Sequence, residues 1–235
     1  MDIVYLLKEN AGEEIIFSLR SLKNIAHGKV FVAGWMPPFL NPKTVVHIPN
    51  LQNSTKYKNA GGNLRAALAD ERVSEDFILF NDDFFVLEQI ENPQEELNLY
   101  LDGAENFLYG MLCKFRSFSP YMTGLWQTCF HLKKRGIKEP LCYELHIPFC
   151  FNKQKLREIM NLPEKKEINI FHTRTAYGNL FLQNSKQAKD VKVLITQNWD
   201  GPQEGQKFLS CSDRAWTKVR DYLVKIFPDK SVYEL

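Results

Sequence analysis

The sequence has few cysteines, and their spacing does not suit pairing. The five are odd in number and form no Cys-x-x-Cys pair; they are Cys113, Cys129, Cys142, Cys150 and Cys211. Cys142, His146 and Cys150 are spaced by four residues, but Pro148 argues against their sharing one helix face. We therefore expect neither a disulfide framework nor a closed zinc site, and the cysteine usage favours a reducing, cytoplasmic location.

Strong charge and long apolar runs are lacking as well. The formal net charge of +2 indicates no general attraction to polyanions. No stretch approaches the roughly 18 apolar residues of a membrane span, and residues 1–8 lack the basic and apolar regions of a signal peptide. Because no repeat or low-complexity segment interrupts the 235 residues, we expect a single domain, residues 1–235, with 163–167 as a candidate hinge.

The most informative segment that is present is a short apolar run followed by acidic residues. Residues 77–80, Phe-Ile-Leu-Phe, are typical of a buried strand in a parallel sheet, and Asn81, Asp82 and Asp83 follow at once. Open α/β sheets bind ligands where their strands end, and paired carboxylates there suit Mg²⁺ or Mn²⁺ carrying a phosphate. The alternative is a plain Asn-Asp-Asp turn.

The order of the hydrophobic patterns predicts the fold class. Up to Asp83 the pattern is β-α-β-β-α-β, with strands at 3–7, 29–33, 44–48 and 77–80, helices at 13–25 and around 64–68, and a polar loop at 50–59. Further helices are expected at 95–101, 105–115, 123–135, 153–160 and 214–227, and extended segments at 141–151 and 191–195. Asn152 is a suitable N-cap for helix 153–160. The sequence therefore predicts an α/β protein with a nucleotide-type crevice and a largely helical C-terminal half.

Six segments, in order along the chain, resemble the Stealth family of sugar-phosphate transferases, which act in bacterial capsule synthesis and in the tagging of lysosomal enzymes. Residues 1–5 are similar to the family's "IDIVY" strand, 14–22 to its "ELRYSLRSL" helix, 77–83 to "FIYFNDD", 144–148 to its H-x-P segment, 207–213 to its fourth block and 227–234 to its "FP-x-x-S-x-[FY]-E" tail. The chain departs from the family at residues 6–8, which are Leu-Leu-Lys where Trp-Val-Asp is usual, and at Ile16, where an Arg is usual.

The resemblance implies a fold and a cofactor. It implies a Rossmann-like sheet of the GT-A type that binds a nucleotide sugar, with residues 1–90 as the donor-binding half and 91–235 as the half that completes the site. It also implies that Asp82 and Asp83 hold a divalent metal, Mg²⁺ or Mn²⁺, and that Asn81 and Asp82 contact the donor pyrophosphate.

The resemblance further implies three catalytic residues, each with a plainer alternative. His146 matches the family's catalytic His, and an imidazole can take a proton from an attacking hydroxyl, although a lone His is more often structural. Arg174 matches an Arg that binds phosphate oxygens, and its alternative is a surface ion pair. Asp213 helps to hold the metal or to orient His146, or it is an ordinary N-cap.

Two further residues are candidates for binding the donor. Arg20, on the predicted first helix, reaches donor phosphates or pairs with an acidic neighbour. Asn63 lies in Asn-Ala-Gly-Gly-Asn-Leu-Arg, residues 59–65, where glycines ahead of a helix either present backbone N–H groups to a phosphate or form a plain turn.

The resemblance therefore predicts a metal-dependent transferase that moves sugar-1-phosphate from a nucleotide sugar to a hydroxyl on a glycan, another polymer or modified nucleic acid. An ordinary GT-A glycosyltransferase, which releases a nucleoside diphosphate, is the second hypothesis. The third is a non-catalytic protein that binds nucleotide, or nucleic acid through the basic segment 131–138, although such segments are commonly solvated helix ends.

Overall fold

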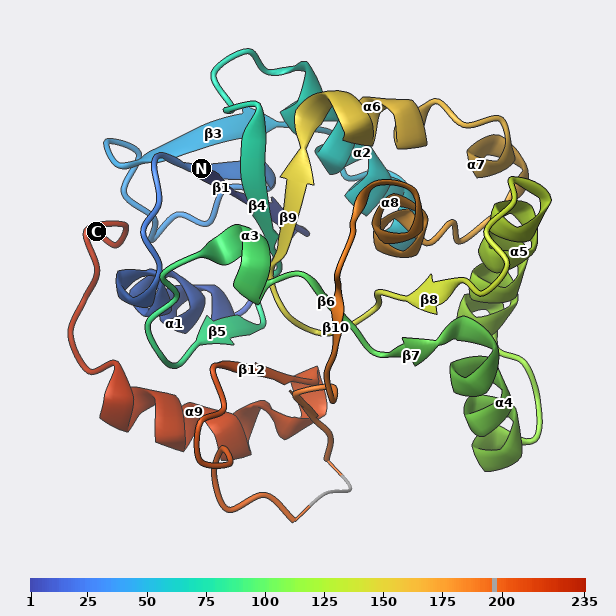
Figure 1. Cartoon of the computed structure of the whole chain (residues 1–235). Coiled ribbons are helices and arrows are strands. Elements are labelled where there is room, and N and C mark those ends of the chain that lie inside the picture. Colours follow the sequence, from blue (N-terminus) through green and yellow to red (C-terminus); the bar gives the residue numbers. More distant parts are fainter. Residues whose placement is uncertain (196–197) are drawn as a thin grey trace. The chain divides into compact units, whose positions relative to one another are not determined.

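The computed structural model describes residues 1–195 and 198–235 and shows a mixed α/β protein (Figure 1). Two compact units are present. The first contains residues 1–97, 146–151 and 191–235, and the second contains 98–145 and 152–190. Residues of the predicted 91–235 half therefore contribute to both units. Within the described residues, no helix is both long and apolar enough to cross a membrane.

A five-stranded sheet organises the first unit. Its order is β3-β2-β1-β4-β9, and the strands are β1 (Asp2–Leu7), β2 (Val30–Gly34), β3 (Val45–Pro49), β4 (Asp76–Phe80) and β9 (Phe149–Asn152). The first four are mutually parallel where they pair. Nearly every side chain of β1, β2 and β4 is buried, as expected for strands covered on both faces. The four predicted strands and their parallel arrangement are thus confirmed.

Helices connect these strands. After β1, the chain forms α1 (Glu14–Ser21) and a short 3₁₀ helix, η1 (Leu22–Asn24). Between β3 and β4 it forms α2 (Lys56–Ala69), which begins before its expected start, so the predicted loop at 50–59 is wrong from Lys56 onwards. Glycine weakens a helix interior, but burial of apolar side chains further along α2 offsets this cost.

A small sheet and the last helix complete the first unit. The sheet has the order β11-β12-β5, with β5 (Phe84–Val86), β11 (Lys192–Val193) and β12 (Phe208–Cys211). A second 3₁₀ helix, η2 (Asp213–Ala215), leads into α9 (Trp216–Ile226). The buried stripe of α9 packs with Phe17, Phe85 and Leu209 in one apolar cluster. The predicted C-terminal amphipathic helix is confirmed.

The second unit is mostly helical. Its helices are α4 (Ala104–Phe115), α5 (Pro120–Lys134), α6 (Lys153–Met160), α7 (Glu164–Glu167) and α8 (Thr173–Phe181). It also has two short strand pairs. β6 (Leu99–Tyr100) pairs with β10 (Lys186–Gln187), and β7 (Asp102–Gly103) pairs with β8 (Leu141–Cys142). The Asn152 side chain caps α6 by accepting from Lys155 N at 3.1 Å, as predicted.

One predicted helix is wrong. Residues 95–101 were expected to be helical, but α3 (Pro93–Glu96) ends at Glu96, and Leu99 and Tyr100 form β6 instead. Tyr100 accepts a backbone hydrogen bond from Ala188, in a segment far along the chain. A partner at that separation overrides local helical spacing.

Candidate functional site

The candidate site lies where the strand order of the parallel sheet reverses. From β1 the chain builds β2 and β3 on one side, and then places β4 on the other side of β1 (Figure 1). In open α/β sheets, the carboxyl ends of the two strands at such a reversal are where ligands commonly bind. Lys8 follows β1, and Asn81, Asp82 and Asp83 follow β4.

Asp83 is held by two residues from the small sheet. Its Oδ2 accepts a hydrogen bond from Ser210 Oγ at 3.0 Å and lies 3.4 Å from Lys192 Nζ. The Asp83 and Lys192 side chains are largely buried, at 19% and 23% exposure. The antiparallel pairing of β12 with β5, which opposes Ser210 to Phe84, brings the hydroxyl beside the carboxylate. The Asn-Asp-Asp segment is also a turn, because Phe84 N donates to Asn81 O at 3.3 Å.

Asp82 lies in a low-dielectric, negatively charged environment. Burial raises the pKa of its carboxyl to about 6, the charge of Asp83 adds to the rise, and Lys8 acts in the opposite direction. Two adjacent carboxylates of this kind favour a nearby positive charge, and their hard oxygens match Mg²⁺ or Mn²⁺. Within residues 1–195 and 198–235 no three His, Cys, Asp or Glu side chains form a metal-binding group. A cation held by Asp82 and Asp83 would therefore need its remaining ligands from outside such a group.

The sheet topology brings His146 to the edge at which β4 ends. β9 lies beside β4 and runs in the opposite direction (Figure 1). The ring contact between Phe77, near the start of β4, and Phe151, near the end of β9, agrees with this, with centroids 5.9 Å apart. His146 precedes β9 by three residues, so it lies at the same sheet edge as Asp82 and Asp83.

Asp213 is drawn toward the end of β1. Its Oδ2 lies 3.9 Å from Lys8 Nζ, with both side chains exposed to solvent. Ser212, not Asp213, occupies the N-cap position of η2. Lys8 therefore lies near Asp213 and also lowers the pKa of Asp82.

Arg20 pairs with an acidic neighbour, the second of its two predicted alternatives. Its Nε and Nη2 donate to the two carboxylate oxygens of Glu234 at 2.9 and 2.7 Å, and Nη1 donates to Phe227 O at 3.0 Å. Both side chains of the pair are largely buried. This fork-to-fork geometry fastens α1 to the C-terminal tail. Contact of Arg20 with a donor phosphate stays a prediction.

Asn63 lies inside α2, and its amide organises the neighbouring polar groups. Asn63 Nδ2 donates to Leu7 O at 3.1 Å, which leaves its Oδ1 to accept from Asn50 Nδ2 and Gln52 Nε2, each at 2.8 Å. Gly61 and Gly62 also lie inside α2. The expectation that these glycines precede a helix is therefore wrong, and their interior position does not offer an N-terminal phosphate site.

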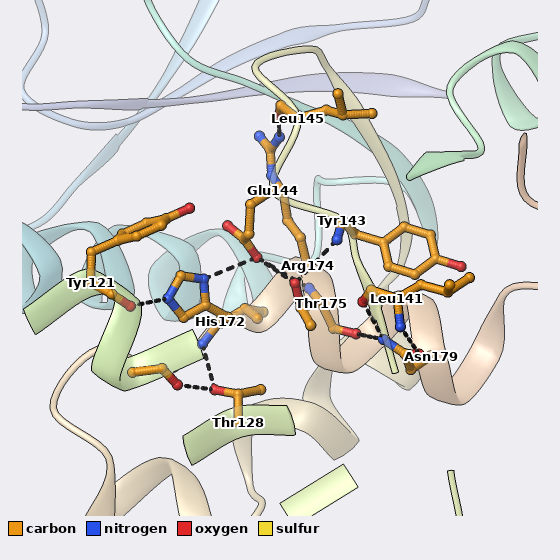
Figure 2. Close-up of polar contacts among 12 residues, drawn as sticks. Tyr121, Thr128, Leu141, Tyr143, Glu144, Leu145, His172, Arg174, Thr175 and Asn179 are labelled. Atoms are coloured by element: carbon orange, nitrogen blue, oxygen red, sulfur yellow. Dashed lines mark hydrogen bonds and ion pairs between the residues drawn. The ribbon is translucent and has the colours of Figure 1, made fainter. Parts of the chain in front are cut away.

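Arg174 lies in the second unit, within a buried polar network (Figure 2). Its Nη1 donates to Leu145 O at 3.0 Å. Glu144 Oε1 accepts from Thr175 Oγ1 at 3.0 Å and lies 3.3 Å from His172 Nδ1. The other ring nitrogen of His172 lies 3.1 Å from Tyr121 O. Both His172 nitrogens thus face oxygen atoms that can accept a hydrogen bond.

The environment of Glu144 stabilises its ionised form. Burial acts to raise the pKa of this carboxyl, but the charge and hydrogen bond of His172, the charge of Arg174 and the Thr175 hydroxyl outweigh burial and lower the pKa to about 2. Glu144 therefore fixes the first turn of α8, which carries Arg174.

Sequence reasoning gave no role to several residues of these two clusters, among them Lys8, Lys192, Ser210 and Glu144. Lys8 had a signal, because it stands where the resembled family has Asp. Glu144 lies inside a recognised segment but was given no role. Lys192 and Ser210 reach Asp83 from 109 and 127 residues away and left no local signal.

Comparison of the chain with models of known protein families, and with curated protein sequences, finds no match.

Proposed function

We propose that this chain is a divalent-metal-dependent transferase that uses a nucleotide-sugar donor and moves sugar-1-phosphate to an acceptor hydroxyl. The observation that carries the proposal is the carboxylate pair Asp82 and Asp83 at the carboxyl edge between β1 and β4. Nucleotides bind at this edge in Rossmann-like sheets, whose strand order 3-2-1-4-5-6 begins as the order β3-β2-β1-β4 does here. The resemblance to the Stealth family supports a GT-A-type core and the choice of reaction.

The residues around the pair suit a diphosphate. Asp82 and Asp83 would hold the metal, which when bound neutralises the diphosphate and stabilises the leaving nucleotide. Lys192, 3.4 Å from Asp83, and Lys8, beside Asp213, add positive charge at the same edge. Lysines of this kind bind phosphate as point charges. Asp213 would then act by positioning Lys8.

His146 is the proposed general base. It accepts the proton of the acceptor hydroxyl as the hydroxyl oxygen forms a bond to the β-phosphorus. The bond from that phosphorus to the bridging oxygen breaks, and the nucleoside monophosphate leaves. Arg174 would bind phosphate oxygens; this role rests on the resemblance alone.

The test is a panel of nucleotide sugars with Mn²⁺ or Mg²⁺, read out by the nucleotide released. A nucleoside monophosphate supports the proposal. A nucleoside diphosphate identifies a glycosyltransferase that attacks the anomeric carbon. Release of neither with any donor contradicts both transferases.

A binding measurement isolates the carboxylate pair. We expect a nucleotide sugar plus Mn²⁺ to raise the melting temperature by several degrees, since a ligand at about 100 times its Kd adds about 2.7 kcal/mol. Asp83→Asn should lose this rise. The control Asp221→Asn, an exposed carboxylate on α9, should keep it. An equal rise in both variants would remove Asp83 from the site.

A further inference from the structure

We infer that the α4–α5 hairpin of the second unit is a docking surface for an anionic lipid bilayer. Charge is the first observation. Residues 106–138 hold six of the 30 Lys and Arg residues and none of the 28 Asp and Glu residues. The rest of the chain is therefore net acidic, although the whole chain is nearly neutral. Such a separation of charge marks a segment that meets a negatively charged partner.

The second observation is a set of exposed aromatic side chains on the same hairpin. Five aromatic residues are between 44% and 71% exposed: Tyr109, Phe115, Phe118, Trp126 and Phe130. The rings of Trp126 and Phe130 stack with centroids 5.8 Å apart and an interplanar angle of 18°. Exposed aromatic side chains gathered on one pair of helices are typical of an interaction surface.

An ion pair shows which helix faces share a side of the hairpin. Glu105 on α4 pairs with Lys133 on α5. Tyr109 lies one turn after Glu105, while Phe130 and Trp126 lie one and two turns before Lys133. Because residues three and four apart are neighbours on a helix face, these aromatic residues lie on the side marked by the ion pair. Phe115 and Phe118 lie at the connection between the helices.

The placement of the cations favours a bilayer over nucleic acid. The cations lie at the two ends of the hairpin, with Lys114 and Arg116 at the connection and Lys134 and Lys138 at the far end, where Lys133 and Arg135 pair with Glu105 and Glu164. No Lys, Arg, Asp or Glu lies between the two ends, in residues 117–132. Lys114 Nζ lies 5.3 Å from the centroid of the Phe115 ring, and Lys134 Nζ lies 4.5 Å from that of Phe130. This arrangement suits binding to a bilayer, in which the aromatic rings would insert among the lipid headgroups while the cations face the lipid phosphates. A phosphodiester backbone would instead be matched by cations along the whole face.

The test uses the full chain in co-sedimentation with vesicles of phosphatidylcholine alone, or with roughly one third phosphatidylglycerol. We expect binding to the second vesicles, weakened by salt because the attraction is screened. Tryptophan emission should shift to shorter wavelength on binding, and Trp126→Phe should lose most of this shift. The measurement does not depend on transferase activity.

Paired variants separate apolar contact from charge. Trp126→Ser with Phe130→Ser should weaken vesicle binding by about tenfold or more, while the control Leu51→Ser with Val232→Ser, exposed apolar residues of the first unit, should not. Lys134→Glu with Lys138→Glu should weaken binding by at least about tenfold, at roughly fivefold per cation. The charge control is Lys43→Glu with Lys225→Glu, exposed lysines of the first unit.

Four results would overturn the inference. The first two are a lack of binding to anionic vesicles and vesicle binding that the aromatic and charge variants leave unchanged. The third is an oligonucleotide that binds through the same residues more tightly than the vesicles do. The fourth is self-association without lipid that the Trp126 and Phe130 substitutions abolish. The last two would assign the surface to nucleic acid or to a second copy of the chain.

Discussion

At the scale of single residues, the surrounding charges and hydrogen bonds set the pKa values of buried carboxyl groups. Asp82 and Glu144 are both carboxylates in buried surroundings, yet their pKa values move in opposite directions. Asp82 has burial and a second carboxylate acting together, whereas Glu144 has a histidine, an arginine and a hydroxyl that outweigh burial. The first residue suits binding of a cation, and the second is already satisfied within the protein.

Glu144→Gln should destabilise the protein in a way that depends on pH. The folded pKa of Glu144, about 2, lies below its ordinary value of 4.5. Its contribution is therefore present above pH 4.5 and is lost as the pH falls toward 2. We expect Glu144→Gln to lower the free energy of unfolding by about 2–3 kcal/mol at pH 7.

Urea denaturation at pH 7 and pH 3.5 measures this effect, and the gap between wild type and variant should be smaller at pH 3.5. Glu139→Gln, at an exposed position nearby, should leave the free energy of unfolding nearly unchanged at both pH values. A gap for Glu144→Gln that stays constant with pH would contradict the assigned charge interactions.

At the scale of elements, a buried ion pair holds α1 to the C-terminal tail. Arg20→Gln should leave Glu234 uncompensated and lower the free energy of unfolding by about 3 kcal/mol. The matched variant is Arg220→Gln, which breaks the more exposed pair with Glu13 and should cost under about 1 kcal/mol. Chemical denaturation measures the free energy of unfolding of both variants. Equal decreases would show that the Arg20–Glu234 pair contributes no more than an exposed ion pair.

The last residue of β2, Gly34, is packed too closely for any side chain. Gly34 has φ +108°, and a Cβ there would collide with Leu7 O and with the Asn63 side chain. Gly136 has φ +93° but has open space around it. Both Gly→Ala variants carry backbone strain of about 1 kcal/mol. Gly34→Ala should lower the free energy of unfolding by about 1–3 kcal/mol more than Gly136→Ala does, because of the collision with Leu7 and with Asn63 of α2. Thermal melting compares the two, and a larger shift in Gly136→Ala would contradict the packing.

At the scale of the whole molecule, the core of the first unit depends on residues from the end of the chain. Leu223 of α9 is fully buried in the cluster that contains Phe17 and Phe85, whereas its neighbour Val224 is 40% exposed. We expect Leu223→Ala to lower the free energy of unfolding by about 2–5 kcal/mol, and Val224→Ala by under about 0.5 kcal/mol. Similar losses in guanidinium titrations of the two variants would mean that α9 is not part of the core.

The predictions that the structure confirms rest on short stretches of sequence. Residues 77–80 form a strand because four apolar residues are followed by turn-forming side chains, and α6 begins at Lys153 because the side chain of Asn152 caps it. The helix expected at 95–101 failed because Leu99 and Tyr100 pair with residues 186 and 187. Gly61 and Gly62 were expected before the helix because glycine has a low helix propensity. They lie inside α2 because burial of apolar side chains further along the helix offsets that low propensity, and this burial depends on the tertiary structure.

The sequence by itself determined the four parallel strands, the acidic end of β4 and the amphipathic stripe of α9, since each depends on side chains within a few residues of one another. The tertiary structure alone decided that Ser210 and Lys192 hold Asp83, that Lys8 lies beside Asp213, and that Arg20 is fastened to Glu234. These contacts join residues far apart in the chain, and their geometry exists only once the strands have paired and the chain ends have packed together. The physical reason is that period and propensity act locally, whereas charge pairing in a folded protein depends on distance in space.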